Sequence, residues 1–161
     1  MKRTGQIMID KFGRLQIKIY RETDNPLPSF KNIGDAGMDI RSNEDTQVTG
    51  FHWTTVGTGL FIIIPHGYEG QVRSRSGLAA KHGLQVLNTP GTIDSGYRDE
   101  LKVILINHSK WAYEIKKGDR IAQLVIKPVE QPQLQEIDKA THILESETEN
   151  RGGGLGSTGV K

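Results

Sequence analysis

Cysteine is absent from this chain, which excludes disulfide bonds, thiolate zinc sites, iron–sulfur clusters and cysteine nucleophiles together. An excess of one charge is also lacking, because 21 Lys and Arg against 19 Asp and Glu leave a net charge of +2. We therefore expect no nucleic-acid partner and no membrane surface as partner. No apolar run reaches the roughly 18 residues of a membrane-spanning helix, and the basic N-terminus lacks the apolar stretch of a signal peptide. The 161 residues suit a single domain, which we expect to be cytoplasmic.

Histidine pairs with metal-ligand spacing are missing as well. The five histidines show no His-x-x-x-His pair and no acid at ligand spacing, so a zinc site built by the protein is not expected. They are His52, His66, His82, His108 and His142.

Strand patterns fill most of the chain. Alternating or continuous short apolar stretches lie at residues 14–20, 59–64, 101–107 and 120–126. Residues 11–13 can turn a short N-terminal hairpin. One short helical turn is expected, between the glycines Gly77 and Gly83. With 19 glycines, about 12% against a usual ~7%, these features predict an all-β, jelly-roll-like sandwich or barrel.

The C-terminal segment has a different composition. Residues 1–144 are expected to form the β domain, with residues 1–11 as an extension, and residues 145–161 a flexible Gly-rich arm. The arm is not a Walker A loop, because no Lys precedes Ser157 and no helix can follow. Its backbone amides, hydroxyls and Arg151 nevertheless suit a polyphosphate.

Two internal segments combine residues that bind nucleotides. Residues 73–77 lead from a strand into the helical turn with two arginines and two serines, either as an anion site or as a capped helix with solvated arginines. Residues 88–100, expected as a hairpin, offer an amide, a carboxylate and an aromatic ring. That set could bind a base edge and a sugar and place a carboxylate beside a water. The alternatives are that Asp94 caps its own backbone and that Tyr97 is simply a good strand former.

In this order the segments resemble the five motifs of the trimeric deoxyuridine triphosphate nucleotidohydrolases (dUTPases). The resemblance runs from about residue 15 to the C-terminus. The motifs are AGMDIRS at 36–42, RSGLA at 75–79, GTIDSGYR at 91–98, GDRIAQ at 118–123 and RGGGLGSTG at 151–159. Ser74 stands where the family usually has Pro, Asp99 where Gly is common, and Leu155 where the arm usually has an aromatic.

The resemblance implies a jelly-roll homotrimer that cleaves dUTP to dUMP and pyrophosphate at sites shared between chains. Mg²⁺ would be held mainly by the triphosphate, with support from Asp39 through water. Asp94 would be the general base, and Tyr97 would pack on the deoxyribose and exclude a 2′-hydroxyl. Uracil would be recognised by Asn88 and the backbone near Thr92 and Ile93.

The same resemblance implies the residues that hold the phosphates and close the site. Phosphate contacts are expected from Arg75, Ser76, Gly77 and Gln123. Lys102 belongs to the expected substrate-binding set. The arm residues expected to cover the substrate are Arg151, Leu155, Gly156, Ser157 and Thr158.

Two other functions fit less of the sequence. One is a dCTP deaminase-like or bifunctional enzyme on the same fold, although such enzymes lack the Asp94–Tyr97 segment in this form. The other is a nucleotide-gated regulatory protein that binds a protein partner, against which the retained Asp94 argues.

Overall fold

The computed structural model describes residue 9 and residues 11–149. The fifth motif, with Arg151, Leu155, Gly156, Ser157 and Thr158, lies outside the described residues, as does most of the N-terminal extension. Contacts divide the chain into two units, residues 1–130 and 131–161.

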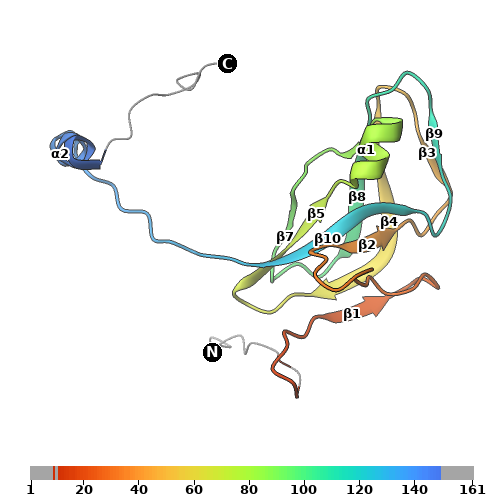
Figure 1. The fold of residues 1–161 in the computed structure, drawn as a ribbon, viewed down its shortest axis with the longest axis horizontal. Helices are drawn as coiled ribbons and strands as arrows, with labels where there is room; N and C mark the ends of the chain where they lie inside the picture. The colour runs from red at the N-terminus through yellow and green to blue at the C-terminus, as the bar shows by residue number, and fades with distance from the viewer. Residues whose placement is uncertain (1–8, 10, 150–161) are drawn as a thin grey trace. The chain divides into compact units, whose positions relative to one another are not determined.

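The first unit consists of β-strands and one short helix (Figure 1). Its elements are β1 (Lys18–Arg21), β2 (Met38–Arg41), β3 (Thr46–Val48), β4 (Trp53–Ile63), β5 (Tyr68–Arg73), α1 (Ser76–His82), β6 (Leu84–Val86), β7 (Gly91–Ile93), β8 (Glu100–Asn107), β9 (Tyr113–Ile115) and β10 (Arg120–Pro128). The antiparallel strands form two four-stranded sheets, ordered β1-β4-β8-β6 and β2-β10-β5-β7, and a two-stranded β3-β9 ribbon. The prediction of an all-β, jelly-roll-like fold is confirmed.

Alternate residues of the strands form the core. In β8, Leu101, Val103 and Leu105 are buried while the residues between them are more exposed. The apolar run in β4 follows the same rule, since Leu60 and Ile62 are buried but Ile63 is 39% exposed. One apolar face of each strand therefore lies in the core, as the period of two dictates.

Glycine ends the helix α1, as the sequence predicts. Gly83 has φ 66°, and its backbone N–H donates to the carbonyl of Ala79. Only glycine adopts this left-handed conformation without steric cost. The ring of His82 lies 4.8 Å from that of Tyr113, which places α1 at the β3-β9 end of the unit (Figure 1).

The segment expected as a hairpin folds differently. β7 pairs with β5, whereas β8 pairs with β4 and β6, so residues 94–99 cross from one sheet to the other. The hairpin expected at the N-terminus agrees with the antiparallel bridge between Ile9 and Leu15.

The second unit contains a helix that the sequence analysis did not predict. α2 spans Lys139–Glu149 and includes three glutamates that were assigned to a flexible arm. Asp138 begins it, because its carboxylate accepts a hydrogen bond from the Thr141 backbone N–H at 2.8 Å. Glutamate is a good helix former, so a capping residue upstream was the missed signal. No helix in the described part of the chain is long and apolar enough to cross a membrane.

Candidate active site

Strand register brings residues of three motifs together at one end of a sheet. β10 lies between β2 and β5, and its Gln123 pairs with Asp39 on one side and with Arg73 on the other. Arg75 follows two residues beyond Arg73. Gln123, Asp39 and Arg75 are thus neighbours although they are up to 84 residues apart in the sequence.

The carboxylate of Asp39 orients two arginines. Its Oδ1 accepts a hydrogen bond from Nε of Arg75 at 3.0 Å, and its Oδ2 accepts one from Nη1 of Arg120 at 3.3 Å. Arg75 also donates through Nη1 to the Arg120 carbonyl at 2.8 Å. Two guanidinium groups held in this way present their remaining N–H donors in a fixed arrangement, which suits a phosphate.

These residues line a pocket of about 420 Å³. Its lining residues are Ser29, Lys31, Asp35, Ala36, Gly37, Asp39, Arg75, Arg120 and Gln123. A Cβ on Gly37 would lie 2.5 Å from Oε1 of Gln123, so glycine leaves the space that this amide occupies. Ser76 and Gly77 follow Arg75 as the exposed first residues of α1.

A tight turn positions the fourth motif beside this pocket. Oδ2 of Asp119 accepts a hydrogen bond from the Lys116 backbone N–H at 2.9 Å, and the Asp119 N–H donates back to the Lys116 carbonyl. Gly118 has φ 92° within the turn. Gly118 and Asp119 therefore shape the start of β10, which carries Gln123.

Asp94 begins a second turn, and its carboxylate is exposed. The turn is closed by the Tyr97 N–H, which donates to the Asp94 carbonyl at 3.0 Å. Nη1 of Arg98 braces it by donating to the carbonyls of Ser95 and Tyr97. Within residues 11–149 no hydrogen-bond donor occupies the Asp94 carboxylate, so the interpretation that it caps its own backbone is wrong. The carboxylate can accept a proton from a water.

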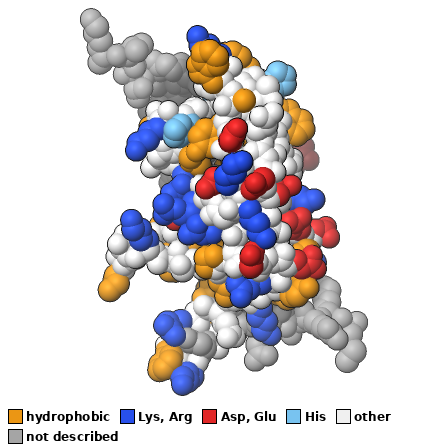
Figure 2. Space-filling model, turned by 90° about the vertical axis from the view of Figure 1, so that its right-hand side faces the viewer, with side chains coloured by type: hydrophobic (Ala, Val, Ile, Leu, Met, Phe, Trp, Pro, Cys, Tyr) orange, Lys and Arg blue, Asp and Glu red, His pale blue; other side chains and the backbone are white. Residues whose placement is uncertain are grey.

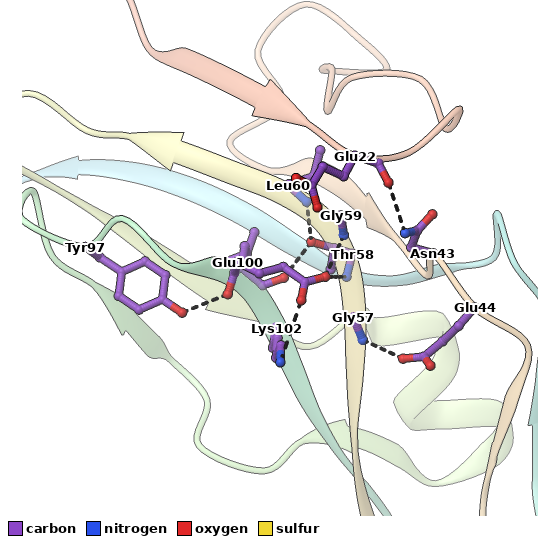
Figure 3. A network of polar contacts seen from close by, with 11 residues as sticks. Glu22, Asn43, Glu44, Gly57, Thr58, Gly59, Leu60, Tyr97, Glu100 and Lys102 are labelled. Carbon is purple, nitrogen blue, oxygen red and sulfur yellow. Dashed lines mark hydrogen bonds and ion pairs between the residues drawn. The ribbon is translucent and has the colours of Figure 1, made fainter.

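Tyr97 is anchored on the first residue of β8 (Figure 3). Its hydroxyl donates to the Glu100 carbonyl at 2.7 Å. Burial raises the pKa of Tyr97 above its ordinary value of 10.0, and the negative charges of Asp99 and Glu100 raise it further. The hydroxyl therefore stays protonated and keeps donating at neutral pH. Tyr97 lies outside any strand, so the interpretation of a simple strand former is wrong.

Glu100 has a structural role that the sequence analysis missed. Its Oε1 accepts hydrogen bonds from the backbone N–H groups of Thr58 at 3.0 Å and Gly59 at 2.8 Å, where the β4–β8 register shifts (Figure 3). Nζ of Lys102 lies 3.6 Å from its Oε2. Lys102 is thus held on the Tyr97 side of the molecule, in a polar pocket of about 370 Å³ that Glu44 also lines.

The expected base-recognition residues lie along and before β7. Thr92 pairs with Gln71, and Ile93 pairs with Gly70. The Asn88 amide packs against Gly91, where an added Cβ would lie 3.0 Å from its Nδ2. Asn88 and Thr92 are both exposed.

The two groups of candidate residues lie beyond opposite ends of the β5–β7 ladder. Asp94 follows Ile93, which pairs with Gly70, whereas Arg75 follows the other end, where Val72 pairs with Gly91. From Gly70 to Arg73 alone the strand rises about 10 Å. One chain therefore does not place Asp94 beside Arg75 and Gln123.

Charge alone does not locate the site. Basic and acidic side chains are interspersed on the face of the molecule seen in Figure 2. Among residues 9 and 11–149, no three His, Asp or Glu side chains are grouped as a metal site would require. Each oxygen of Asp39 accepts a hydrogen bond from an arginine.

The structure defines an antiparallel jelly-roll-like β protein with an arginine-containing pocket suited to anions and a separate exposed aspartate turn. The dUTPase family model matches residues 23–159. A deoxyuridine 5′-triphosphate nucleotidohydrolase of Nautilia profundicola is 49% identical over 146 residues, covering 90% of this chain and 99% of the relative. That of Fusobacterium nucleatum is 47% identical over 148 residues, with 91% and 98% covered.

Solved structures agree with the sequence relatives. A variant of the Staphylococcus bacteriophage 80alpha dUTPase with dUpNHpp aligns with a TM-score of 0.79 and 28% identity, covering 90% of this chain and 99% of that one. A dUTPase variant from phage phi11 of S. aureus, which coordinates a structural Mg(II) ion, aligns with a TM-score of 0.71 and 27% identity over 77% and 97% of the two chains. This chain belongs to the dUTPase family.

Proposed function

We propose that the protein is a dUTP diphosphatase, which hydrolyses dUTP to dUMP and pyrophosphate and so keeps uracil out of DNA. The observation that carries this proposal is the exposed Asp94 carboxylate, free of hydrogen-bond donors from the described residues, in a turn braced by Arg98 and followed by Tyr97. The names of the relatives support the same substrate.

Asp94 acts as the general base in this proposal. It accepts a proton from a water whose oxygen attacks the α-phosphorus. The bond from the α-phosphorus to the bridging oxygen breaks, and pyrophosphate leaves with the electron pair. A positioned general base typically contributes 10²–10⁴-fold to the rate.

The other candidate residues divide between the base, the sugar and the phosphates. Tyr97 packs against the deoxyribose, with its hydroxyl fixed on the Glu100 carbonyl. Asn88 and the backbone of Thr92 and Ile93 bind the uracil edge, and Lys102 completes the substrate contacts.

The phosphates are bound by the pocket at the other end of the ladder. Its donors include the fixed guanidinium of Arg75 and the amide of Gln123. Ser76 and Gly77, which follow Arg75 at the start of α1, complete the phosphate contacts. A bound Mg²⁺ would neutralise phosphate charge and would be held mainly by the triphosphate, as is usual for this ion. Asp39 would support it through water.

Because Asp94 and Arg75 lie beyond opposite ends of the β5–β7 ladder, we propose a homotrimer in which each site takes them from different chains. The segment of residues 145–161, whose first five residues form the end of α2, would close over a neighbouring chain's site with Arg151, Leu155, Gly156, Ser157 and Thr158. The cytoplasmic location stays a prediction.

One assay separates this function from its alternatives. We expect pyrophosphate release from dUTP, with little from dTTP, dCTP or UTP, and dUMP as the product. Release of ammonia from dCTP would instead indicate a deaminase. Binding of dUTP without turnover would indicate a regulatory protein.

A further inference from the structure

The phosphate-side pocket has a wall that none of the five motifs supplies. The segment between β1 and β2 contributes Ser29, Lys31 and Asp35 to the lining, which also includes Arg75 and Gln123. Of these three residues, Lys31 brings a cation into a pocket already suited to anions.

A local turn holds the backbone of Lys31 at the pocket. Immediately after it, Oδ2 of Asp35 accepts hydrogen bonds from the backbone N–H of Asn32 at 2.8 Å and from Asn32 Nδ2 at 3.2 Å. The Asp35 N–H donates back to the Asn32 carbonyl at 3.3 Å. Gly34, at φ 90°, provides the left-handed residue that the turn needs. The lysine therefore extends from a closed turn.

The charges of the pocket leave Lys31 as the available cation. Its lining contains three cations and two carboxylates. Asp39 is shared by Arg75 and Arg120, and Asp35 is engaged by Asn32. Among residues 11–149, no carboxylate forms an ion pair with Lys31. An ammonium on a flexible four-carbon stem can follow a ligand in a way that the two fixed guanidinium groups cannot.

We propose that Lys31 is a further binding residue for the triphosphate and contacts the phosphates distal to the sugar. The inference rests on the proposed function for the nucleotide class. The α-phosphorus has to lie near the water that Asp94 activates, so the cations of the separate Arg75 pocket bind the β- and γ-phosphates. Lys31 adds a mobile third cation to this pair.

The test compares triphosphate with monophosphate binding by calorimetry, using dUpNHpp and dUMP. Lys31→Gln should weaken dUpNHpp binding by about fivefold or more, equivalent to about 1 kcal/mol, and leave dUMP binding unchanged. Lys31→Arg should restore most of the dUpNHpp affinity. Lys127→Gln is the matched control, because Lys127 is exposed at the other end of β10 from Arg120, and it should bind both ligands like the wild type.

The outcomes separate this inference from the proposed function. Wild-type affinity of Lys31→Gln for dUpNHpp would overturn the role of Lys31, as would an equal loss of dUMP binding. If Lys31→Gln loses only triphosphate affinity but the wild type does not hydrolyse dUTP, the proposed function fails and the binding role stands. A wild type that does not bind dUpNHpp would overturn both.

Discussion

Replacement of Glu100 by alanine should destabilise the β domain strongly, although the residue lies outside the catalytic machinery. Its Oε1 is the acceptor for the backbone N–H groups of Thr58 and Gly59, and Thr58 is only 1% exposed. A buried donor left without an acceptor costs about 1–3 kcal/mol. The Glu100 side chain is 25% exposed, so water can replace part of the loss. We therefore expect a decrease of about 2–4 kcal/mol in the free energy of unfolding.

Glu100→Gln is the matched control for this substitution. The glutamine carbonyl can still accept both N–H bonds, and only the ion pair with Lys102 is lost. That pair spans 3.6 Å and its lysine is 56% exposed, so its loss should cost less than about 1 kcal/mol.

Thermal unfolding at one fixed protein concentration measures both variants. At roughly 2–4 °C per kcal/mol for a domain of this size, Glu100→Ala should melt about 4–16 °C below the wild type and Glu100→Gln within a few degrees of it. Equal destabilisation by both variants would refute this reasoning. It would show that the negative charge of Glu100, and not its oxygen as an acceptor for the two N–H groups, stabilises the domain.

Asp94→Asn should lower kcat by at least about 10²-fold with little change in dUpNHpp affinity, as measured by pyrophosphate release and calorimetry, and retention of a tenth of the wild-type rate would contradict a general base. Tyr97→Ala should narrow the ratio of kcat/KM for dUTP over UTP, because the ring that excludes the 2′-hydroxyl is lost; an unchanged ratio would remove Tyr97 from that role. The hydrogen bonds from Thr141 hold the pKa of Asp138 below its usual 3.8. This cap therefore stabilises α2 above that pH and is lost as the pH falls through the lowered pKa. Helical ellipticity should decrease on acidification, and the decrease should be absent in Asp138→Ala.

The strands were predictable because the alternation of apolar and polar residues that marks them can be seen among residues close together in the sequence. Leu101, Val103 and Leu105 alternate with more exposed positions, so a period of two in the sequence identifies the inward face of β8. Gly83 likewise marks the end of α1 through its own backbone preference. The crossing of residues 94–99 between sheets was not predictable, since it depends on the partners that β7 and β8 take elsewhere in the chain.

The same distinction holds for the site. The residues Asp94, Tyr97 and Arg75 could be identified because they belong to motifs that follow one another along the sequence in a recognisable order. Glu100 and Lys31 could not, because their roles come from contacts with Thr58 and with the Arg75 pocket that only the folded chain creates.

Mixing two inactive variants tests whether one site draws on two chains. Asp94 and Arg75 lie beyond opposite ends of the β5–β7 ladder. A site that needs both residues therefore has to take them from two different chains. Chains with Asp94→Asn and chains with Arg75→Ala should each be nearly inactive alone. After the two are refolded together in equal amounts, about a quarter of the sites should combine an intact Asp94 with an intact Arg75.

Pyrophosphate release should then recover toward about a quarter of the wild-type rate. Light scattering and circular dichroism of each variant alone provide the control that it still assembles and folds. If the mixed sample is no more active than the sum of its separate components, both residues serve the same chain. In that case Asp94 would have to reach the Arg75 pocket by a rearrangement of residues 94–99, the segment that crosses between the sheets.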